Sequence, residues 1–303
     1  MTERQDHDPT GSGGVQTAQD ALAPGLYFVS TPIGAARDIT LRALDILATA
    51  DVLAVEDTRT ARKLLELHGI ARRARSIVAY HDHNASLVRP KLMADLAAGR
   101  SVAYASDAGT PLLADPGYRL ARAAIVAGHP VHASPGPSAL LSALAVAGLP
   151  TDRFLFAGFP PTKAGKRRAW LADQAACRAT VVFYESAKRV HDLLGALCDT
   201  FGAETEGAIC RELTKRHEEV LRGSLTALRA QIDGRALKGE IVVVVAPPEP
   251  TAPNPDDVEA ALRRALASGS TRDAAETVAR EYGLARRDVY RLALTLTNPS
   301  EGV

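Results

Sequence analysis

Cysteine, aromatic residues and long apolar stretches are all scarce in this chain of 303 residues. The three cysteines, Cys177, Cys198 and Cys210, are too few and too widely spaced to predict a zinc site, and we interpret them as buried thiols in a reducing compartment. No apolar run approaches the ~20 residues that a membrane-spanning helix needs. The acidic N-terminus lacks the apolar segment of a secretory signal, so we expect a cytoplasmic protein with no membrane partner.

An excess of charge of either sign is also missing. Lys and Arg together number 36, Asp and Glu 35, and the formal net charge is +1. Hydrophobic residues make up 46% and charged residues 23%, which is typical of a globular protein, while aromatic residues at 5% leave Ala, Leu and Val to build the core. This balance neither requires nor excludes a nucleic-acid partner, because the clustering of charge decides such binding.

Strand and helix patterns alternate from Leu26 onward, which predicts an α/β architecture with a mainly parallel sheet between helices. Residues 1–24 are polar and predict a disordered tail. Gly148-Leu149-Pro150 marks a boundary, beyond which a second α/β unit follows. We therefore predict an N-terminal α/β domain over residues 25–149, a C-terminal α/β domain over 150–247, a proline-rich linker over 248–255 and a small helical appendage over 256–303.

Hydrophobic periodicity places the elements within these parts. The expected strands are Leu26–Ser30, Val52–Val55, Ile77–Tyr80, Val102–Ala105, Val131–Ala133, Phe154–Phe156, Thr180–Tyr184, Ala208–Arg211 and Ile241–Val245. The expected helices of the two domains are Ile39–Ala50, Thr60–Leu67, Leu87–Ala98, Tyr118–Ala127, Ser138–Ala147, Arg167–Ala176, Arg189–Phe201 and Leu225–Asp233. In the appendage, Asp273–Tyr282 and Arg286–Leu294 flank Gly283, which predicts either a helix-turn-helix or a plain helical packing module.

Small or functional polar residues follow each of the first five expected strands. Because ligands bind beyond the carboxyl ends of strands in such sheets, these loops together predict one ligand cleft. Taken singly, each loop has a structural explanation as a turn, a helix cap or a surface ion pair, and one His-x-His pair without a third ligand does not predict a metal site. The loops are Thr31-Pro32-Ile33-Gly34, Glu56-Asp57-Thr58-Arg59, His81-Asp82-His83-Asn84, Ser106-Asp107-Ala108-Gly109-Thr110-Pro111 and Ser134-Pro135-Gly136-Pro137-Ser138.

In this order, the loops resemble those of the RsmI family, the small-subunit ribosomal RNA (cytidine-2′-O)-methyltransferases of the tetrapyrrole-methylase superfamily. The resemblance covers about residues 25–247, and it departs at Ala35-Ala36, where the family usually has Asn-Leu. Further motifs carry it: Gly158-Phe159, Gly165-Lys166-Arg167-Arg168, Phe183-Tyr184-Glu185-Ser186, Arg211-Glu212-Leu213-Thr214-Lys215 and Lys238-Gly239-Glu240.

The resemblance implies two α/β domains of the tetrapyrrole-methylase type with the ligand cleft between them. It implies 2′-O-ribose methylation of a cytidine in small-subunit (16S) ribosomal RNA, with the RNA or the 30S subunit as partner and a homodimeric enzyme. The implied methyl donor is S-adenosylmethionine, whose activated sulfonium needs no metal. The residues implied to bind this donor are Ile33, Gly34, Asp107, Ala108, Gly109, Thr110, Ser138, Ala139, Tyr184, Lys238, Gly239 and Glu240.

Methyl transfer to a ribose hydroxyl needs an in-line approach at ~3–3.5 Å and a base for the hydroxyl proton. The sequence leaves five candidates for this base open: Asp57, His81, Asp82, Glu185 and Lys215. RNA affinity needs contacts to phosphate, and a basic cluster would supply them, although such clusters also serve as solubilising surface. The residues predicted to bind RNA are Arg59, Lys163, Lys166, Arg167 and Arg168.

Three other functions compete with RNA methylation. A methyltransferase acting on a tetrapyrrole of the precorrin or uroporphyrinogen type would share the fold, but it would not need the basic cluster. A nucleotide-binding oxidoreductase would want Gly-x-Gly-x-x-Gly after the first strand, and Thr31–Arg37 contains no such motif. A non-catalytic nucleic-acid module centred on the C-terminal helices would leave the five strand-end loops unexplained.

Overall fold

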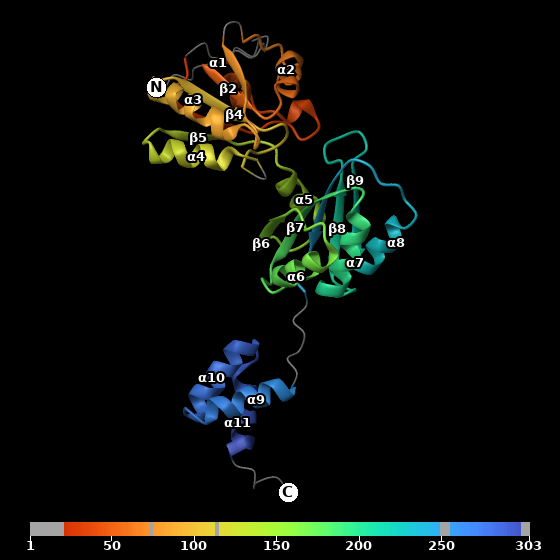
Figure 1. Ribbon diagram of the computed structural model, residues 1–303. Coiled ribbons are helices and arrows are strands. Elements are labelled where there is room, and N and C mark those ends of the chain that lie inside the picture. The colour runs from red at the N-terminus through yellow and green to blue at the C-terminus, as the bar shows by residue number, and fades with distance from the viewer. Residues whose placement is uncertain (1–20, 73–74, 113–114, 249–254, 298–303) are drawn as a thin grey trace, which may run out of the picture. The chain divides into compact units, whose positions relative to one another are not determined.

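The computed structural model describes residues 21–72, 75–112, 115–248 and 255–297. The chain divides into two units, Met1–Pro247 and Pro248–Val303 (Figure 1). Nearly all of the predicted disordered tail and most of the predicted linker lie outside the described residues. Within the described part of the chain, no helix is long and apolar enough to cross a membrane.

The first sheet has five strands in the order β3-β2-β4-β1-β5, and every pair is parallel. Strands β1, β2 and β4 are buried along their whole length, because helices cover both faces of the sheet and each face has its own hydrophobic cluster. The strands are β1 (Gly25–Val29), β2 (Val52–Val55), β3 (Ser76–Ala79), β4 (Ser101–Ala105) and β5 (Val131–Ser134). The helices are the 3₁₀ turn η1 (Ala36–Asp38), α1 (Leu41–Thr49), α2 (Thr58–Leu67), α3 (Ala85–Ala97) and α4 (Gly117–Val126).

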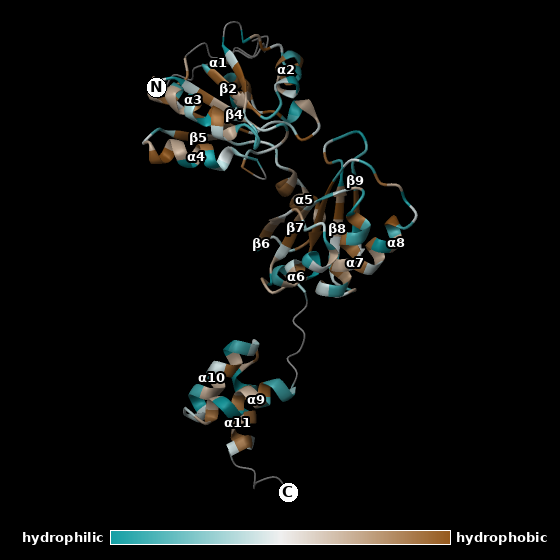
Figure 2. Ribbon diagram, in the orientation of Figure 1, coloured by the Kyte–Doolittle hydropathy of each residue, from teal (hydrophilic) through white to brown (hydrophobic). Residues whose placement is uncertain are grey.

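The second sheet is mixed, in the order β6-β7-β10-β8-β9. Only β6 and β7 are parallel, and β10 lies antiparallel between β7 and β8. Its strands are β6 (Phe154–Gly158), β7 (Thr180–Ser186), β8 (Glu206–Arg211), β9 (Glu219–Ser224) and β10 (Glu240–Val245), and its helices are α6 (Ala164–Ala175), α7 (Val190–Phe201) and α8 (Leu225–Ile232). Figure 2 shows the hydrophobic colouring concentrated along the strands of both sheets. The predicted α/β class is confirmed, and the edge strand β9 was not predicted.

Helix α5 (Ala139–Ala147) follows β5 in the chain but packs against the second sheet. Its residues Leu140, Ala143 and Leu144 share a hydrophobic cluster with Val242 and Val244 of β10. Ser138 caps the N-terminus of this helix and Gly148 ends it in the left-handed conformation. By packing, α5 therefore belongs with the second sheet, although the sequence pattern groups it with the first; the predicted division into domains stays a prediction.

The C-terminal unit consists of three helices, α9 (Pro255–Leu266), α10 (Thr271–Tyr282) and α11 (Arg286–Thr297). Ser270 caps the N-terminus of α10, and Gly283 ends that helix with a φ of 66°. Val278 and Val289 are buried in a cluster formed by residues of these three helices. The unit therefore has a core of its own, and the predicted pair of helices around Gly283 is present.

Candidate functional site

The loops after β1 and β4 are bonded to each other at the carboxyl edge of the first sheet. The backbone groups of Thr31 and Gly109 exchange two hydrogen bonds of 3.0 Å, and the Thr31 hydroxyl donates to the Ser106 carbonyl at 3.1 Å. Gly109 has a φ of +77°, and a Cβ there would stand 3.2 Å from Cγ2 of Ile33. Glycine therefore lets the two loops come together, and the parallel sheet brings them to one edge as the sequence predicts.

A cavity of about 230 Å³ opens beside these loops and is lined by residues of both sheets. We refer to it as the donor cavity. Residues predicted to bind the methyl donor make up most of its lining: Ile33, Ala108, Gly109, Thr110, Ser138, Ala139, Tyr184 and Glu240. Phe159, Glu185, Ile241 and Val242 complete it, and of these Phe159 and Ile241–Val242 are additions to the predicted site.

Four residues predicted to bind the donor do not line this cavity. Gly34 and Asp107 line an adjacent cavity of about 190 Å³ beside the first sheet, whose lining includes leucines of α1, α2 and β2. Lys238 and Gly239 precede β10, and Gly239 has a φ of +92° in close contact with the Glu212 carboxylate. The predicted donor residues therefore divide between the donor cavity and the segments that support it.

Tyr184 connects the donor cavity to helix α5. Its hydroxyl oxygen accepts a hydrogen bond of 3.1 Å from the backbone N–H of Leu140 in the first turn of that helix. The ring contacts Phe156 and Phe159 edge-on, with centroids 4.8 and 5.7 Å away. Burial raises the pKa of the Tyr184 phenol, so the hydroxyl stays neutral and keeps the helix end in place.

Glu185 is a carboxylate buried in the wall of the donor cavity, with only 4% of its surface exposed. Its Oε1 accepts from the Arg189 guanidinium at 2.6 Å and from the backbone N–H of Ser186 at 2.7 Å. Its Oε2 is buried and has no hydrogen-bond partner among the described residues. Because buried carboxylate oxygens are normally paired, this oxygen has unused capacity to accept a hydrogen bond or a proton.

The loop between β8 and β9 joins the second sheet to the loop after β1. Glu212 and Thr214 adopt the left-handed region at φ of 52° and 63°, and the Thr214 hydroxyl accepts from the Ala35 backbone N–H at 3.0 Å. Strain of this kind in two residues without glycine's freedom is typical of functional loops. A Cβ at Gly34 would stand 2.5 Å from Cγ of Lys215, so the contact is close.

Lys215 is held as a cation. Its ammonium lies 2.9 Å from Oε1 of Glu212 and 2.9 Å from Oε2 of Glu240. Burial lowers the pKa of Lys215, but the hydrogen bonds to these two carboxylates outweigh burial and raise it overall. A lysine can accept a proton only in its neutral form, so this environment argues against Lys215 as the base. It favours a role for the positive charge of Lys215 instead.

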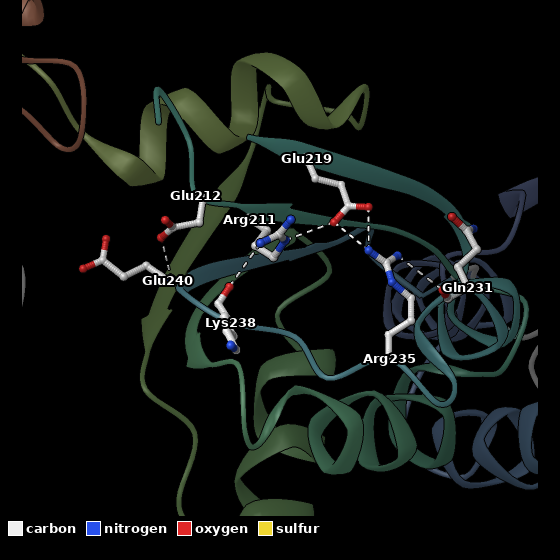
Figure 3. A network of polar contacts seen from close by, with 7 residues as sticks. All are labelled: Arg211, Glu212, Glu219, Gln231, Arg235, Lys238 and Glu240. Carbon is white, nitrogen blue, oxygen red and sulfur yellow. Dashed lines mark hydrogen bonds and ion pairs between the residues drawn. The ribbon is translucent and has the colours of Figure 1, made fainter. Parts of the chain in front are cut away.

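A polar network supports the segment that leads into β10 (Figure 3). Arg211 donates to the Lys238 carbonyl at 3.3 Å and to Oε2 of Glu219 at 3.0 Å. Arg235 donates to both oxygens of Glu219, at 2.7 and 2.9 Å. The network holds the backbone of Lys238, two residues before Glu240, which lines the donor cavity.

Three acidic residues are linked by hydrogen bonds from backbone N–H groups to carboxylates at the edge of the first sheet. Glu56 Oε1 accepts from the Asp107 N–H at 3.1 Å, and Asp107 Oδ1 accepts from the Asp57 N–H at 3.0 Å. Burial raises the pKa of Glu56, and the negative charges of Asp107 and Asp115 add to this effect. Hydrogen bonds from Arg59 lower the pKa of Asp57 to about 2, which makes Asp57 a weak base. Glu56 is not among the bases predicted from the sequence, since nothing local signals its burial.

The His-Asp-His-Asn loop is held by its last residue. Asn84 accepts from the His81 N–H at 2.9 Å through its side-chain oxygen and donates to the Ala79 carbonyl at 2.9 Å. The His81 and His83 rings meet edge-on with centroids 5.9 Å apart, and Nδ1 of His81 is buried without a partner among the described residues. Asp82 contributes negative charge beside Glu56.

The residues predicted to bind RNA are in different environments. Arg59 is exposed and pairs with Asp57 at 2.7 Å. Arg168 pairs with Asp199 at 3.4 Å, whereas Lys163 and Lys166 are exposed and form no ion pair within the described residues. Arg167 differs from the others, because it is 7% exposed and packs between α6 and α7. The predicted basic cluster is therefore not a uniform exposed surface.

Comparison with known proteins places this geometry in context. The chain matches Tetrapyrrole (Corrin/Porphyrin) Methylases over residues 25–229 and the RsmI C-terminal HTH domain over residues 252–297. It is 48% identical to a ribosomal RNA small subunit methyltransferase I of Mesorhizobium japonicum, over 92% of this chain and 94% of that protein. A protein of the same name from Mycobacterium tuberculosis is 43% identical, over 89% and 94% of the two chains.

Solved structures show the same fold at low identity. The cobalt precorrin-4 methyltransferase CbiF superposes with a TM-score of 0.55 at 14% identity, over 73% of this chain and 94% of that chain. The uroporphyrin-III-C-methyltransferase of Thermus thermophilus has a TM-score of 0.51 at 23% identity, over 74% and 94%. These likenesses support the two-sheet arrangement around the donor cavity and extend no further than the fold.

Proposed function

We propose that this chain, which belongs to the tetrapyrrole (corrin/porphyrin) methylases and carries an RsmI C-terminal HTH domain, methylates small-subunit ribosomal RNA. The proposed acceptor is the ribose 2′-hydroxyl of a cytidine, and the proposed methyl donor is S-adenosylmethionine. The observation that carries the proposal is the donor cavity, where the predicted donor residues of both sheets come together. Relatives named ribosomal RNA small subunit methyltransferase I, matched along nearly their whole length, support RNA as the acceptor.

The residues of the cavity suit a folded nucleoside with a cationic centre. Ala108, Gly109 and Ala139 leave their backbone groups accessible, and Tyr184 offers an aromatic face. When bound, the donor supplies a methyl group already activated on its sulfonium. The work left to this chain is to hold the two reactants in line, to exclude water and to accept one proton.

We propose that Glu185, one of the five predicted candidates, is the base that accepts the proton of the ribose hydroxyl. Glu185 lines the donor cavity, and its Oε2 is buried without a partner among the described residues, while Arg189 fixes Oε1. Glu56, in the loop after β2, is the alternative base, because burial raises its pKa and brings it closer to neutrality, where a base is effective. Asp57 and Lys215 are disfavoured by their pKa shifts.

The resemblance to the RsmI family supports four further parts of the proposal. The acceptor is a cytidine of 16S ribosomal RNA, and the substrate is either the free RNA or the 30S subunit. The enzyme is a homodimer, and its location is cytoplasmic. The exposed cations Lys163 and Lys166, together with Arg59 and Arg168, remain our proposed contacts to RNA. A tetrapyrrole substrate is the second candidate, because neighbours of the same fold are named for such substrates.

The test combines the purified chain, labelled S-adenosylmethionine and either 16S ribosomal RNA, 30S subunits or uroporphyrinogen. We expect label in RNA only, at one cytidine whose 3′ phosphodiester resists alkaline hydrolysis, because a 2′-O-methyl group blocks the attacking hydroxyl. Label on uroporphyrinogen, or on a base rather than a ribose, would contradict the proposal.

Asp107 allows the donor site to be tested separately. Asp107→Ala is expected to weaken donor binding about ten- to a hundred-fold, because it removes a charged hydrogen-bond acceptor from the loop whose next residues, Ala108 and Gly109, line the donor cavity. Asp107→Asn keeps an acceptor for the Asp57 N–H and removes only the charge, so it separates loop order from charge. Asp173→Ala, at an exposed carboxylate of α6, is the control. Unchanged donor affinity in a folded Asp107→Ala protein would remove Asp107 from the site.

A further inference from the structure

A second polar cavity lies outside the donor cavity, between helices α6, α7 and α8. Its volume is about 280 Å³, and three arginines from these helices line it: Arg167, Arg168 and Arg229. His191 and Gly195 of α7 also belong to its lining. We refer to it as the arginine cavity.

Arg167 is the most unusual residue of the arginine cavity. It is 7% exposed, and its Nε is buried without a hydrogen-bond partner among the described residues. Its ion pair is a 3.9 Å contact from Nη2 to Asp192, whose side chain is 73% exposed. A guanidinium has five N–H donors, and a buried charge is stable only when paired. Arg167 therefore has capacity for a further anionic partner.

Gly195 borders the arginine cavity. It lies inside helix α7, and a Cβ built on it would meet no atom within 4 Å. Glycine destabilises a helix interior relative to alanine, so its presence normally reflects close packing or a special φ angle. Neither applies at Gly195, and the space above it is the cavity itself.

The charges around the arginine cavity favour an anion. Its guanidinium groups outnumber its two carboxylates, which belong to Asp192 and Asp199. Asp199 is 57% exposed and pairs with Arg168 at 3.4 Å, so an incoming anion can replace this weak contact. Arg229 is exposed, and no ion pair or hydrogen bond is found for its side chain within the described residues. Arginine groups in this arrangement suit the oxygens of a phosphate.

The chain connects the arginine cavity to the donor cavity through two short segments. Phe159 lines the donor cavity and the loop after it leads into α6, while Glu185 lines the donor cavity and the turn after it leads into α7. Arg189, at the start of α7, donates to the Pro160 carbonyl at 3.3 Å and so joins the two segments. Helices α6 and α7 therefore each begin five residues after a residue that lines the donor cavity.

We propose that the arginine cavity binds a backbone phosphate of the RNA substrate through Arg167, Arg168 and Arg229. This inference rests on the proposed function, and it adds Arg229 to the residues that contact RNA. It also changes the role of Arg167, which becomes the buried floor of a phosphate site rather than part of an exposed basic cluster.

The test measures RNA affinity as a function of salt concentration. Arg229→Ala is expected to weaken binding roughly three- to ten-fold at low salt and to reduce the slope of log K against log salt by about 0.7, the value for one phosphate contact on a single strand. Lys91→Ala, which removes an exposed cation of α3, is the matched control. A slope for Arg229→Ala equal to that of Lys91→Ala would overturn the proposal.

A second pair of variants fills the arginine cavity without removing a cation. Gly195→Glu places a carboxylate beside Arg167, so it should reduce RNA affinity at least ten-fold while the melting temperature is kept or raised. Gly195→Ala adds only a methyl group in open space and should bind RNA much more tightly than Gly195→Glu. Equal RNA affinity for wild type and Gly195→Glu would show that the cavity does not contact RNA.

Inorganic phosphate separates an RNA contact from a site for the free ion. We expect sodium phosphate to raise the melting temperature of the wild type more than sodium chloride of equal ionic strength, and this difference to be smaller in Gly195→Glu, where only the general stabilising effect of phosphate remains. A phosphate effect combined with an unchanged RNA salt slope would assign the cavity to a free anion and overturn the RNA contact. Methylation of RNA by the wild type tests the proposed function independently, because it needs no variant of this cavity.

Discussion

The two sheets contribute to the donor cavity in different ways. The parallel sheet supplies loops of small residues, such as Ala108 and Gly109, whose backbones form the cavity wall. The mixed sheet supplies large or charged side chains, such as Tyr184 and Glu185, that lie on strands and are fixed by hydrogen bonds. Substitutions that add atoms to the small-residue loops of the parallel sheet should therefore disturb the donor cavity. On the mixed sheet, substitutions that remove or alter a side-chain group should do so.

The largest effect is expected on the side of the mixed sheet, at Glu185. Glu185→Gln keeps an oxygen that can accept from Arg189 and Ser186 but removes the capacity to take a proton. We expect the methyl-transfer rate constant to fall about 10²- to 10⁴-fold, as for other general bases, with donor affinity changed by no more than a few-fold. Single-turnover kinetics and calorimetric donor binding measure the two quantities. A near wild-type rate would move the base to Glu56.

The second-largest effect is expected from a substitution at Gly34, in the loop after β1 of the parallel sheet. In Gly34→Ala the new Cβ would stand 2.5 Å from Cγ of Lys215 and 2.6 Å from the Thr214 hydroxyl, so the loops must move apart. We expect a loss of about 1–3 kcal/mol in the free energy of unfolding, as for other overpacked sites, together with weaker donor binding. Gly165→Ala is the control, because its Cβ meets nothing within 4 Å. Denaturant titration measures the loss, and equal stability for the two variants would contradict the close contact.

A smaller effect is expected for Tyr184→Phe, which removes a single oxygen. The backbone N–H of Leu140 would lose its acceptor, and an unsatisfied buried donor costs about 1–3 kcal/mol. The ring contacts with Phe156 and Phe159 would remain, so donor affinity should fall only about three- to ten-fold. Tyr118→Phe, at an exposed tyrosine of α4, is the control in the same denaturation and binding measurements. A variant as stable as wild type would show that α5 does not depend on this bond.

The pH dependence of stability tests the acidic edge of the parallel sheet. Burial raises the pKa of Glu56 above its ordinary value of 4.5. Below 4.5 the carboxyl is protonated in both the folded and the unfolded state, so it costs nothing. As the pH rises through 4.5 toward the folded pKa, the unfolded state loses its proton first, and the folded state is destabilised by an amount that is complete above that pKa.

Glu56→Gln should therefore raise the melting temperature near neutral pH and leave it unchanged near pH 4. The glutamine oxygen can still accept from the Asp107 N–H, so the loop contact is kept. Melting curves of both proteins across this range measure the difference. A variant that is less stable than wild type at neutral pH would show that the Glu56 charge stabilises the edge instead.

The smallest effect on the donor cavity is expected from truncation at Pro250. The residues of both sheets that line the donor cavity precede Pro250 in the chain. The cluster around Val278 and Val289 is formed by residues of α9, α10 and α11. The truncated chain should melt close to the full-length protein and bind the donor equally well, with a modest loss of RNA affinity. Aggregation, or a much lower melting temperature, would show that the C-terminal unit completes the fold.

The sequence by itself determined the alternation of strands and helices and the functional edge of the first sheet. Hydrophobic periodicity is local, and the carboxyl ends of parallel strands meet at one edge, so the residue pattern alone assigns the motifs after β1 and β4 to one site. Strand β9 was missed because it is a half-buried edge strand whose pattern depends on its pairing with β8.

Only the tertiary structure decided which charged residues are free, paired or buried. Lys166, Arg167 and Arg168 are consecutive and look alike in the sequence, but of the three only Arg167 is buried. The packing of α5 on the second sheet and the raised pKa of Glu56 were equally hidden. The reason is physical: burial and Coulomb interactions depend on distances to residues far away in the chain, and these distances exist only once the chain has folded.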